Sequence, residues 1–379
     1  DVRFETVKNA DDGRLVFFLG SELPLGAQVD FCPIGAFCQE VDSLDLPIDV
    51  GNIILKPKGS SKRIAAFKRW EENQLKEQDD FLYDIESKSV LYYSKTNPAL
   101  LYDEMEAALR KHNITGTHDV IIDGLALSCS AAHGVGGGGQ YRATIRNCDI
   151  TWIGGGHLTG YERKHVRFGN GVEFWAGASD NLVENNFFAE VYDVAMSNQG
   201  RELCEVNNVV WRNNIICRCE QSYEIWFTNP ETQIRGLVFE QNTSVDTGCG
   251  WSHRQRPDKR GTHLLSYRLK PLVFDMHVRK NVFCNTKNDL IWFLNERAAE
   301  FKIDDNVWWQ PVVNGVPGTE QKLFFWDAAK PKYVTFDEYR KLTGNDKKSR
   351  FIEPKFADPA HDDYRITNRE QIGDAGAIR

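Results

Sequence analysis

One phrase recurs between residues 118 and 311: an apolar or β-branched run, a polar pair that usually ends in Asn, and a second apolar run. Its clearest copies span 182–187 (LVENNF) and 210–215 (VWRNNI). Aligned on the last polar position, the copies fall at 124, 148, 186, 214, 242, 281 and 306, so successive intervals are 24, 38, 28, 28, 39 and 25 residues. Such a period with occasional insertions predicts stacked turns of short parallel strands, with the insertions as side loops. Asn suits the corners because it tolerates left-handed backbone conformations.

These repeats, together with 169–175 (GNGVEFW) and 180–186 (DNLVENN), resemble right-handed parallel β-helix proteins of the pectate-lyase-like superfamily. The resemblance covers about half of the chain and implies an all-β fold in which each turn buries its apolar face against its neighbours. It also implies a carbohydrate-active protein. It does not specify the reaction, because the superfamily includes polysaccharide lyases, glycoside hydrolases, epimerases and non-catalytic stalks.

The predicted parallel β-helix core spans 118–311 and is flanked by two different regions. Residues 1–117 read as β-rich, either early turns or an accessory domain, with strands at 14–19 and 52–55 and a hairpin formed by 81–84 and 89–93. A short amphipathic helix is expected at 103–111. Residues 312–379 are loop-rich and charged, with a short helix expected at 336–342, and we interpret them as a C-terminal cap that covers exposed strand edges.

Composition excludes several classes of function. Among 379 residues, 46 Lys and Arg stand against 54 Asp and Glu, and a net charge of -8 argues against a nucleic-acid-binding face. No run of 18 apolar residues exists, so no membrane span is predicted. The chain begins at Asp1 without Met or a leader, so we expect a mature or trimmed chain of a secreted, periplasmic or cell-surface protein. The nine scattered cysteines are expected to be mostly buried small hydrophobes. Calcium is chemically compatible with the many carboxylates, but no EF-hand-like loop occurs, and no metal or other cofactor is predicted.

A second strand follows each turn, and its register predicts a row of acidic side chains. Registering on the first apolar residue places Val172, Val194, Ile225, Leu264 and Leu290 in one inward column. Because side chains alternate along a strand, the flanking Asp193, Glu224, His263 and Asp289 then point outward in one column, and Glu173, Ala195 and Trp226 in the next. Asp193 and Glu224 would project from strands about 4.8 Å apart. Two such carboxyls repel one another, which raises one pKa and leaves the other group ionised, as an acid/base pair requires.

The surroundings of this row distinguish it from plain solvated surface. Aromatic side chains stack on sugar rings, while carboxylates and amides bond their hydroxyls. An insertion at 248–263 is locally basic and should fold over the row, where Arg254 or Arg256 would bind a carboxylate or sulfate on an acidic sugar. The predicted substrate-binding residues are Trp175, Asn198, Gln199, Glu220, Tyr223, Trp226, Trp251, His253, Arg254, Arg256, Arg268 and His157.

Three functions remain open. In each of them the partner is a polysaccharide or oligosaccharide, and acidic glycans are among the candidates. The leading hypothesis is a glycoside hydrolase that uses Asp193 and Glu224 as acid and base or nucleophile, with Glu173 as a further candidate for a catalytic carboxyl. The alternative is a lyase or epimerase acting on a uronate. The base and the charge-neutralising groups of such an enzyme would come from His253, His263, Arg254, Arg256, Tyr267 and Arg268. The third is a non-catalytic glycan-binding β-helix, which predicts short side loops and no convergent pocket.

Overall fold

The computed structural model describes residues 48–115, 118–161, 165–295, 297–326 and 332–378, and the backbone alone of four short strands before residue 48. These residues form a nearly all-β protein with long stacks of parallel strands, which is compatible with the predicted parallel β-helix. The chain divides into two compact units. The first comprises Asp1–Asn113, Ser128–His133 and Trp152–Gly169, and the second comprises Ile114–Leu127, Gly134–Thr151 and Asn170–Arg379.

The first unit is built on an antiparallel pair, β5 (Val50–Pro57) and β10 (Tyr102–Leu109). The helix expected at 103–111 is therefore wrong. The segment alternates like a strand, because Met105 and Ala107 enter the core while Glu104 and Glu106 form ion pairs outside it. The predicted hairpin is confirmed as β8 and β9. The remaining strands that belong wholly or partly to this unit are β1 (Val2–Glu5), β2 (Leu15–Leu19), β3 (Gln28–Phe31), β4 (Gln39–Glu40), β6 (Ile64–Ala65), β7 (Phe67–Lys68), β8 (Asp80–Asp84), β9 (Ser89–Tyr92), β13 (Ala126–Ser130), β18 (Gly156–His157) and β19 (Arg167–Phe168).

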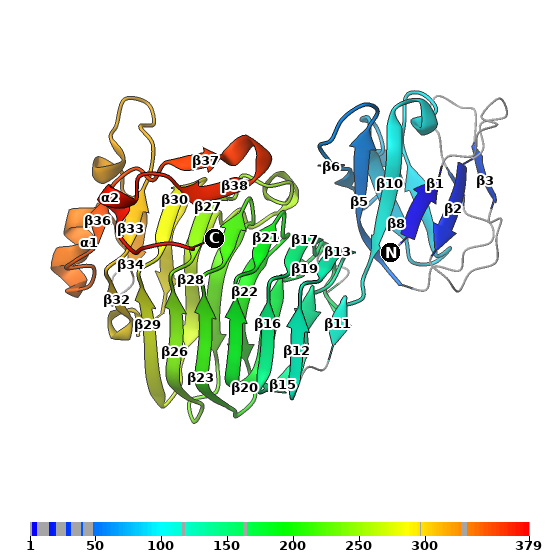
Figure 1. The fold of residues 1–379 in the computed structure, drawn as a ribbon. Helices are drawn as coiled ribbons and strands as arrows, with labels where there is room; N and C mark the ends of the chain where they lie inside the picture. The colour runs from blue at the N-terminus through cyan, green and yellow to red at the C-terminus, as the bar shows by residue number, and fades with distance from the viewer. Residues whose placement is uncertain are drawn as a thin grey trace. The chain divides into compact units, whose positions relative to one another are not determined.

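Three ladders of parallel strands make up the second unit, and successive repeats add one strand to each (Figure 1). Ladder A contains β12 (Val120–Asp123), β16 (Ala143–Arg146), the end of β20 (Val172–Glu184), β23 (Glu205–Arg212), β26 (Gln233–Glu240), β29 (Val273–Arg279) and β32 (Lys302–Asp304). Ladder B contains β17 (Asp149–Ile153), β21 (Phe187–Ala189), β24 (Ile215–Cys217), β27 (Thr243–Thr247), β30 (Val282–Thr286), β33 (Val307–Trp309) and β36 (Arg350–Phe351). Ladder C contains β11 (Ile114–Thr115), β14 (Val135–Gly136), the start of β20, β22 (Val194–Gly200), β25 (Gln221–Phe227), β28 (Thr262–Leu269), β31 (Asp289–Leu294) and β34 (Phe324–Trp326).

The corner between ladders A and B carries the asparagines that define the repeat. The side-chain oxygens of Asn214, Asn242 and Asn281 each accept from the backbone and side-chain nitrogens of the asparagine one repeat earlier, at 2.9–3.1 Å. The residue before each of these asparagines has a positive φ, which turns the chain from one strand into the next. The strand pairing reproduces the predicted intervals of 38, 28, 28, 39 and 25 residues. The first interval is 23 rather than 24, because Asp123 pairs with Arg146.

The interior between the ladders is aromatic. Trp211 packs against Phe174 and Tyr223, and Phe283 stacks on Trp308 at 4.4 Å between ring centroids. At the last repeat, the predicted helix forms as α1 (Phe336–Thr343), capped by Thr335 and packed on Phe324. The remaining elements are β15 (Gly138–Tyr141), β35 (Lys332–Val334), β37 (Phe356–Asp358), β38 (Asp363–Ile366) and α2 (Arg369–Ile372).

The last residues of the chain cover the outer side of ladder B. Tyr364, Ile366 and Ile372 form a core cluster with side chains of β24, β27 and β30. The backbone nitrogen of Ala377 donates to the Thr243 hydroxyl at 2.9 Å. The tail therefore packs along a sheet face, while α1 lies at the final repeat.

Candidate active site

The outward face of ladder C presents carboxyls and aromatic rings in two neighbouring columns. Strand pairing aligns Glu173, Ser197 and Glu224 in one column, which continues through Leu265 and Trp292. Two residues further along the strands, Trp175, Gln199 and Trp226 form the second column. Because side chains alternate along a strand, both columns project on the same side of the sheet.

Glu224 lies near the middle of this face and is only 5% exposed. Its Oε2 accepts from Nε2 of Gln199 at 2.5 Å, and it also forms a hydrogen bond with the Tyr267 hydroxyl. Burial raises the pKa of the Glu224 carboxyl well above its ordinary value, and the nearby Asp193 carboxylate raises it further. Both effects favour the protonated form of Glu224.

Asp193 precedes β22 and contacts a guanidinium. Nη1 of Arg256 donates to Oδ1 of Asp193 at 2.8 Å and to the carbonyl oxygen of Tyr192 at 3.0 Å. Another edge of the same guanidinium, formed by Nε and Nη2, donates two hydrogen bonds to the Asp258 carboxylate. Burial raises the pKa of Asp193, but the Arg256 charge opposes that rise. The two carboxyls are therefore placed in different electrostatic environments although they are close enough to repel one another.

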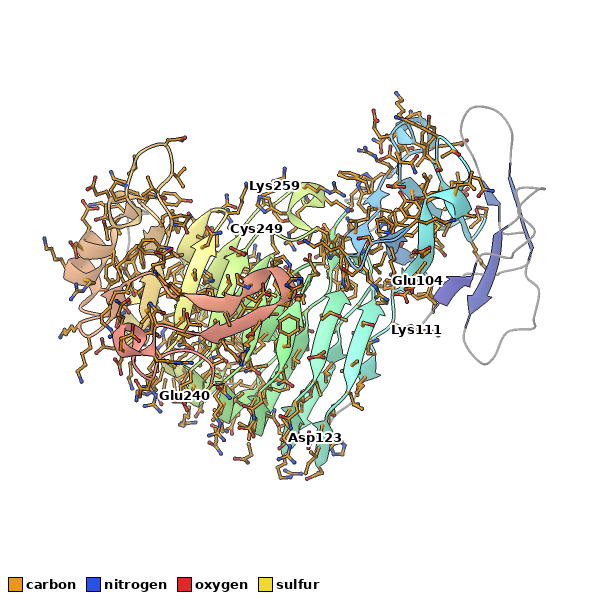
Figure 2. All side chains as sticks on the ribbon, turned by 45° about the horizontal axis from the view of Figure 1, so that its top comes forward. Glu104, Lys111, Asp123, Glu240, Cys249 and Lys259 are labelled. Atoms are coloured by element: carbon orange, nitrogen blue, oxygen red, sulfur yellow. The ribbon has the colours of Figure 1, made fainter. Side chains whose placement is uncertain are left out.

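Glu220 binds the side loop that carries Arg256, the insertion at 248–263, through hydrogen bonds. This fully buried carboxylate accepts from the Arg260 backbone nitrogen at 2.7 Å and from Nδ1 of His253 at 3.1 Å. Trp251 is buried against Tyr192 and donates from Nε1 to the carbonyl oxygen of Glu190 at 2.9 Å. Cys249 and Lys259, labelled in Figure 2, mark the two ends of the loop. Glu220, His253 and Trp251 thus anchor the loop to the scaffold.

Aromatic side chains lie beside Glu224. Trp226 forms an edge contact with Trp175 at 5.3 Å between ring centroids and stacks on Tyr267 at 5.9 Å. Arg201 lies over the Trp226 ring at 5.9 Å. Trp175 and Tyr267 are half-buried, so this group combines apolar ring surface with the carboxyl and amide groups of Glu224 and Gln199.

The register predicted for ladder C is wrong in its details. The residues that align with Val172 and Leu264 are Met196, Tyr223 and Ile291, not Val194, Ile225 and Leu290. Asp193, Glu224, His263 and Asp289 therefore do not form one column. Asp193 aligns with Glu220, and Asp289 aligns with Thr262.

Three predicted site residues, Asn198, Tyr223 and His263, lie in the interior of the second unit. His263 is fully buried, hydrogen-bonds Ser244 at 2.7 Å and packs on Phe283, and burial lowers its pKa to about 3. Asn198 is also fully buried, and its Oδ1 accepts from Trp211 and from the Tyr223 hydroxyl. Expecting these side chains at the surface is wrong, because β22, β25 and β28 each direct these positions toward the aromatic core.

The remaining predicted residues are spread over different environments. Glu173 is 8% exposed and accepts from Nδ2 of Asn170 at 2.8 Å. Arg254 and Arg268 are exposed. His157 belongs to the first unit, where it is buried and its backbone nitrogen donates to Asp49. Two contributors to the site were missed in the sequence, Asp258 and Arg260; the short spacing of both from Arg256 within one charged loop is the signal that points to them.

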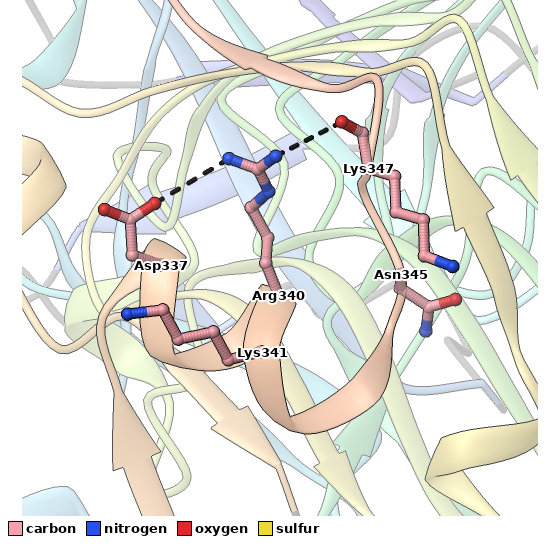
Figure 3. A pocket seen from close by; sticks show the side chains of 5 residues that line it. All are labelled: Asp337, Arg340, Lys341, Asn345 and Lys347. Carbon is pink, nitrogen blue, oxygen red and sulfur yellow. Dashed lines mark hydrogen bonds and ion pairs between the residues drawn. The ribbon is translucent and has the colours of Figure 1, made fainter.

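Three further kinds of feature bear on function: a cavity, a cluster of metal-ligating side chains and a membrane-spanning helix. A cavity of about 330 Å³ beside α1 is lined by Asp337, Arg340, Lys341, Asn345 and Lys347 (Figure 3). Arg340 is there engaged by Asp337 and by the carbonyl oxygen of Lys347. In the part of the chain that the structure describes, no group of three or more His, Cys, Asp or Glu side chains is arranged to hold a metal ion. Within the same residues, none of the helices has the length and apolar character needed to cross a bilayer.

Compared with family models and with the sequences of curated proteins, the chain shows no match. Its function is therefore argued from the geometry of the Asp193–Glu224 region.

Proposed function

We propose that the chain is a secreted glycoside hydrolase with a right-handed parallel β-helix fold, and that Glu224 and Asp193 are its general acid and its base or nucleophile. The observation that carries this proposal is that two interacting carboxyls lie in different electrostatic environments. Burial and the Asp193 charge favour the protonated form of Glu224. Burial also raises the pKa of Asp193, but the charge and hydrogen bond of Arg256 oppose that rise and favour the ionised form. A glycosidic bond is cleaved by one protonated and one ionised carboxyl group.

The groups around the pair suit a sugar substrate. The half-buried Trp175 and Tyr267, which pack against the buried Trp226, offer ring surface for the apolar face of a sugar, and Gln199 orients the Glu224 carboxyl. The long loop that contains Arg256 covers one side of the row, which is unlike the short side loops of a purely structural β-helix. These features favour an enzyme over a glycan-binding stalk.

Hydrolysis is favoured over elimination from a uronate by the state of the cationic residues. Elimination needs a free base and a cation that neutralises the substrate carboxylate. The two histidines suited to the base role are engaged, because His263 is buried in the core and His253 is bonded to Glu220. Among the cations, Arg256 is bound to two aspartates, whereas Arg254 and Arg268 are exposed.

The experiment is a comparison of Glu224→Gln and Asp193→Asn with the parent protein on a panel of polysaccharides. Release of reducing ends reports hydrolysis, and near-ultraviolet absorbance of an unsaturated uronate reports elimination. Each substitution should lower the hydrolytic rate by about 10²- to 10⁴-fold. Glu231→Gln, which alters an exposed glutamate on a turn, is the matched control and should retain the parent rate. Full hydrolytic rates in both site variants would refute the assignment, and an ultraviolet signal would indicate a lyase.

A further inference from the structure

Arg260 lies on the same outward face as Glu224 but is not engaged by the proposed acid/base pair. Its guanidinium carbon is 4.1 Å from the centre of the Trp292 ring. Trp292 occupies the same column as Glu224, two strands further along ladder C. Adjacent strands are about 4.8 Å apart, so the two positions are separated by about 10 Å. A short oligosaccharide bridges such a distance.

The position of Arg260 is fixed from two directions. Its backbone nitrogen donates to the buried carboxylate of Glu220 at 2.7 Å, so the end of the side loop is held on the scaffold. Its side chain rests on Trp292, whose other neighbour is Phe325, with the two rings stacked at 5.4 Å between centroids. Stacking on an aromatic ring leaves the N–H groups at the edge of a guanidinium directed away from the ring, where they bind planar anions.

The charge of Arg260 is only partly compensated. Asp289, at the start of β31, is an acidic residue whose charge interacts with Arg260, and it is 6% exposed. Burial raises the pKa of Asp289 to about 7, with Arg260 opposing the rise. Near neutral pH a substantial fraction of Asp289 is therefore protonated and does not neutralise the guanidinium. The Tyr333 hydroxyl lies within the same group and hydrogen-bonds Arg260.

We propose that Arg260, supported by Trp292 and Tyr333, binds the anionic group of an acidic sugar at a position about two strands away from Glu224. This inference rests on the proposed function and deepens it, because it assigns the substrate to the acidic glycans. The anionic group is a uronic-acid carboxylate or a sulfate ester, both of which accept paired hydrogen bonds from a guanidinium. Arg256, in contrast, is occupied by Asp193 and Asp258 and serves the acid/base pair.

The test measures binding in the Glu224→Gln variant, so that the probes are not consumed. The probes are tetragalacturonate, a sulfated galactose tetrasaccharide that contains no uronic acid, and a neutral galactose tetrasaccharide, titrated by calorimetry. Arg260→Ala should weaken binding of the anionic probe by at least tenfold and leave the neutral probe unchanged. Arg260→Lys should recover part of the affinity, because it restores the charge without the planar fork. Arg235→Ala, which removes an exposed arginine from β26, is the matched control.

The outcomes separate this inference from the proposed function. Preference for tetragalacturonate identifies a carboxylate ligand, and preference for the sulfated galactose probe identifies a sulfate ligand; either supports the proposal. Equal affinities in Arg260→Ala and Arg235→Ala would overturn it, as would the failure of both anionic probes to bind the variant that retains Arg260. If Glu224→Gln abolishes hydrolysis while Arg260→Ala changes no affinity, the proposed function stands and this inference fails. Loss of neutral-probe binding together with a lowered melting temperature in both Arg260 variants would also count against it.

Discussion

Removal of Asn242 should show whether the asparagine stack holds the repeats together. The Asn242 side chain makes four hydrogen bonds: its Oδ1 accepts two from Asn214, and its Nδ2 donates to the Trp211 carbonyl oxygen and to Oδ1 of Asn281. All four are buried. At about 1 kcal/mol of net stability for each hydrogen bond, Asn242→Ala should lower the free energy of unfolding by about 4 kcal/mol.

Urea titration followed by tryptophan fluorescence measures this loss as a shift of the midpoint at an unchanged slope. Asn207→Ala is the matched control, because Asn207 lies in β23 and its side chain bonds only the exposed Glu205 among the contacts described here. That control should change stability by less than about 0.5 kcal/mol. If Asn242→Ala costs less than about 1 kcal/mol, or no more than Asn207→Ala, the asparagine stack does not stabilise the corner and the reasoning fails.

Two further outcomes concern pH. Arg256→Gln removes the charge that opposes protonation of Asp193, so the pKa of Asp193 should rise. The acid limb of the hydrolytic pH–rate profile should then move to higher pH. An acid limb at the parent position would contradict the role of Arg256. His263 has a folded-state pKa of about 3, below its unfolded value, so its contribution to stability is present above pH 6.5 and is lost as the pH falls toward 3. Between pH 7 and pH 5 this loss is about 2 kcal/mol, and His263→Gln should show a correspondingly smaller decrease in the urea midpoint. An unchanged decrease would show that His263 titrates normally.

The repeat was readable from the sequence because its corner is chemically demanding. Each corner needs a residue that accepts a positive φ, followed by a side-chain amide that bonds both the backbone and the next amide in the stack. The pairs Asn185-Asn186 and Asn213-Asn214 meet both requirements. Lys280 and Asp305 take the first position with positive φ as well, so only the second residue is restricted to Asn in those repeats. The ladder A register follows from these positions. Gly124 was misaligned by one residue because it lies before the first asparagine of the stack.

The register of ladder C could not be obtained in the same way. From each asparagine of the stack to its ladder C equivalent, the chain runs 10 residues from Asn186 to Met196 but 9 from Asn214 to Tyr223. A change of one residue reverses which side chains face outward. The inward column also includes the polar-tipped Tyr223, which an apolar alignment passes over in favour of Ile225. Glu224 lies four residues beyond the position opposite Asp193 on the adjacent strand, and the two carboxyls still interact electrostatically.

The helix expected at 103–111 and the exposed His263 failed for a common reason. In both cases a charged or polar residue was expected to face solvent, whereas the folded chain gives it a partner from a distant segment. Glu106 pairs with Arg63, and His263 bonds Ser244. Partners that come from distant parts of the chain are invisible to local periodicity.

The most direct test of the account is a crystal structure of the Glu224→Gln variant with a bound oligosaccharide. The account predicts that a sugar ring lies against Trp175 or Tyr267, with a glycosidic oxygen within hydrogen-bond distance of the side chain at position 224 and with Asp193 facing the same sugar. Saccharide bound only elsewhere, such as in the cavity beside α1, with Asp193 and position 224 untouched, would contradict it.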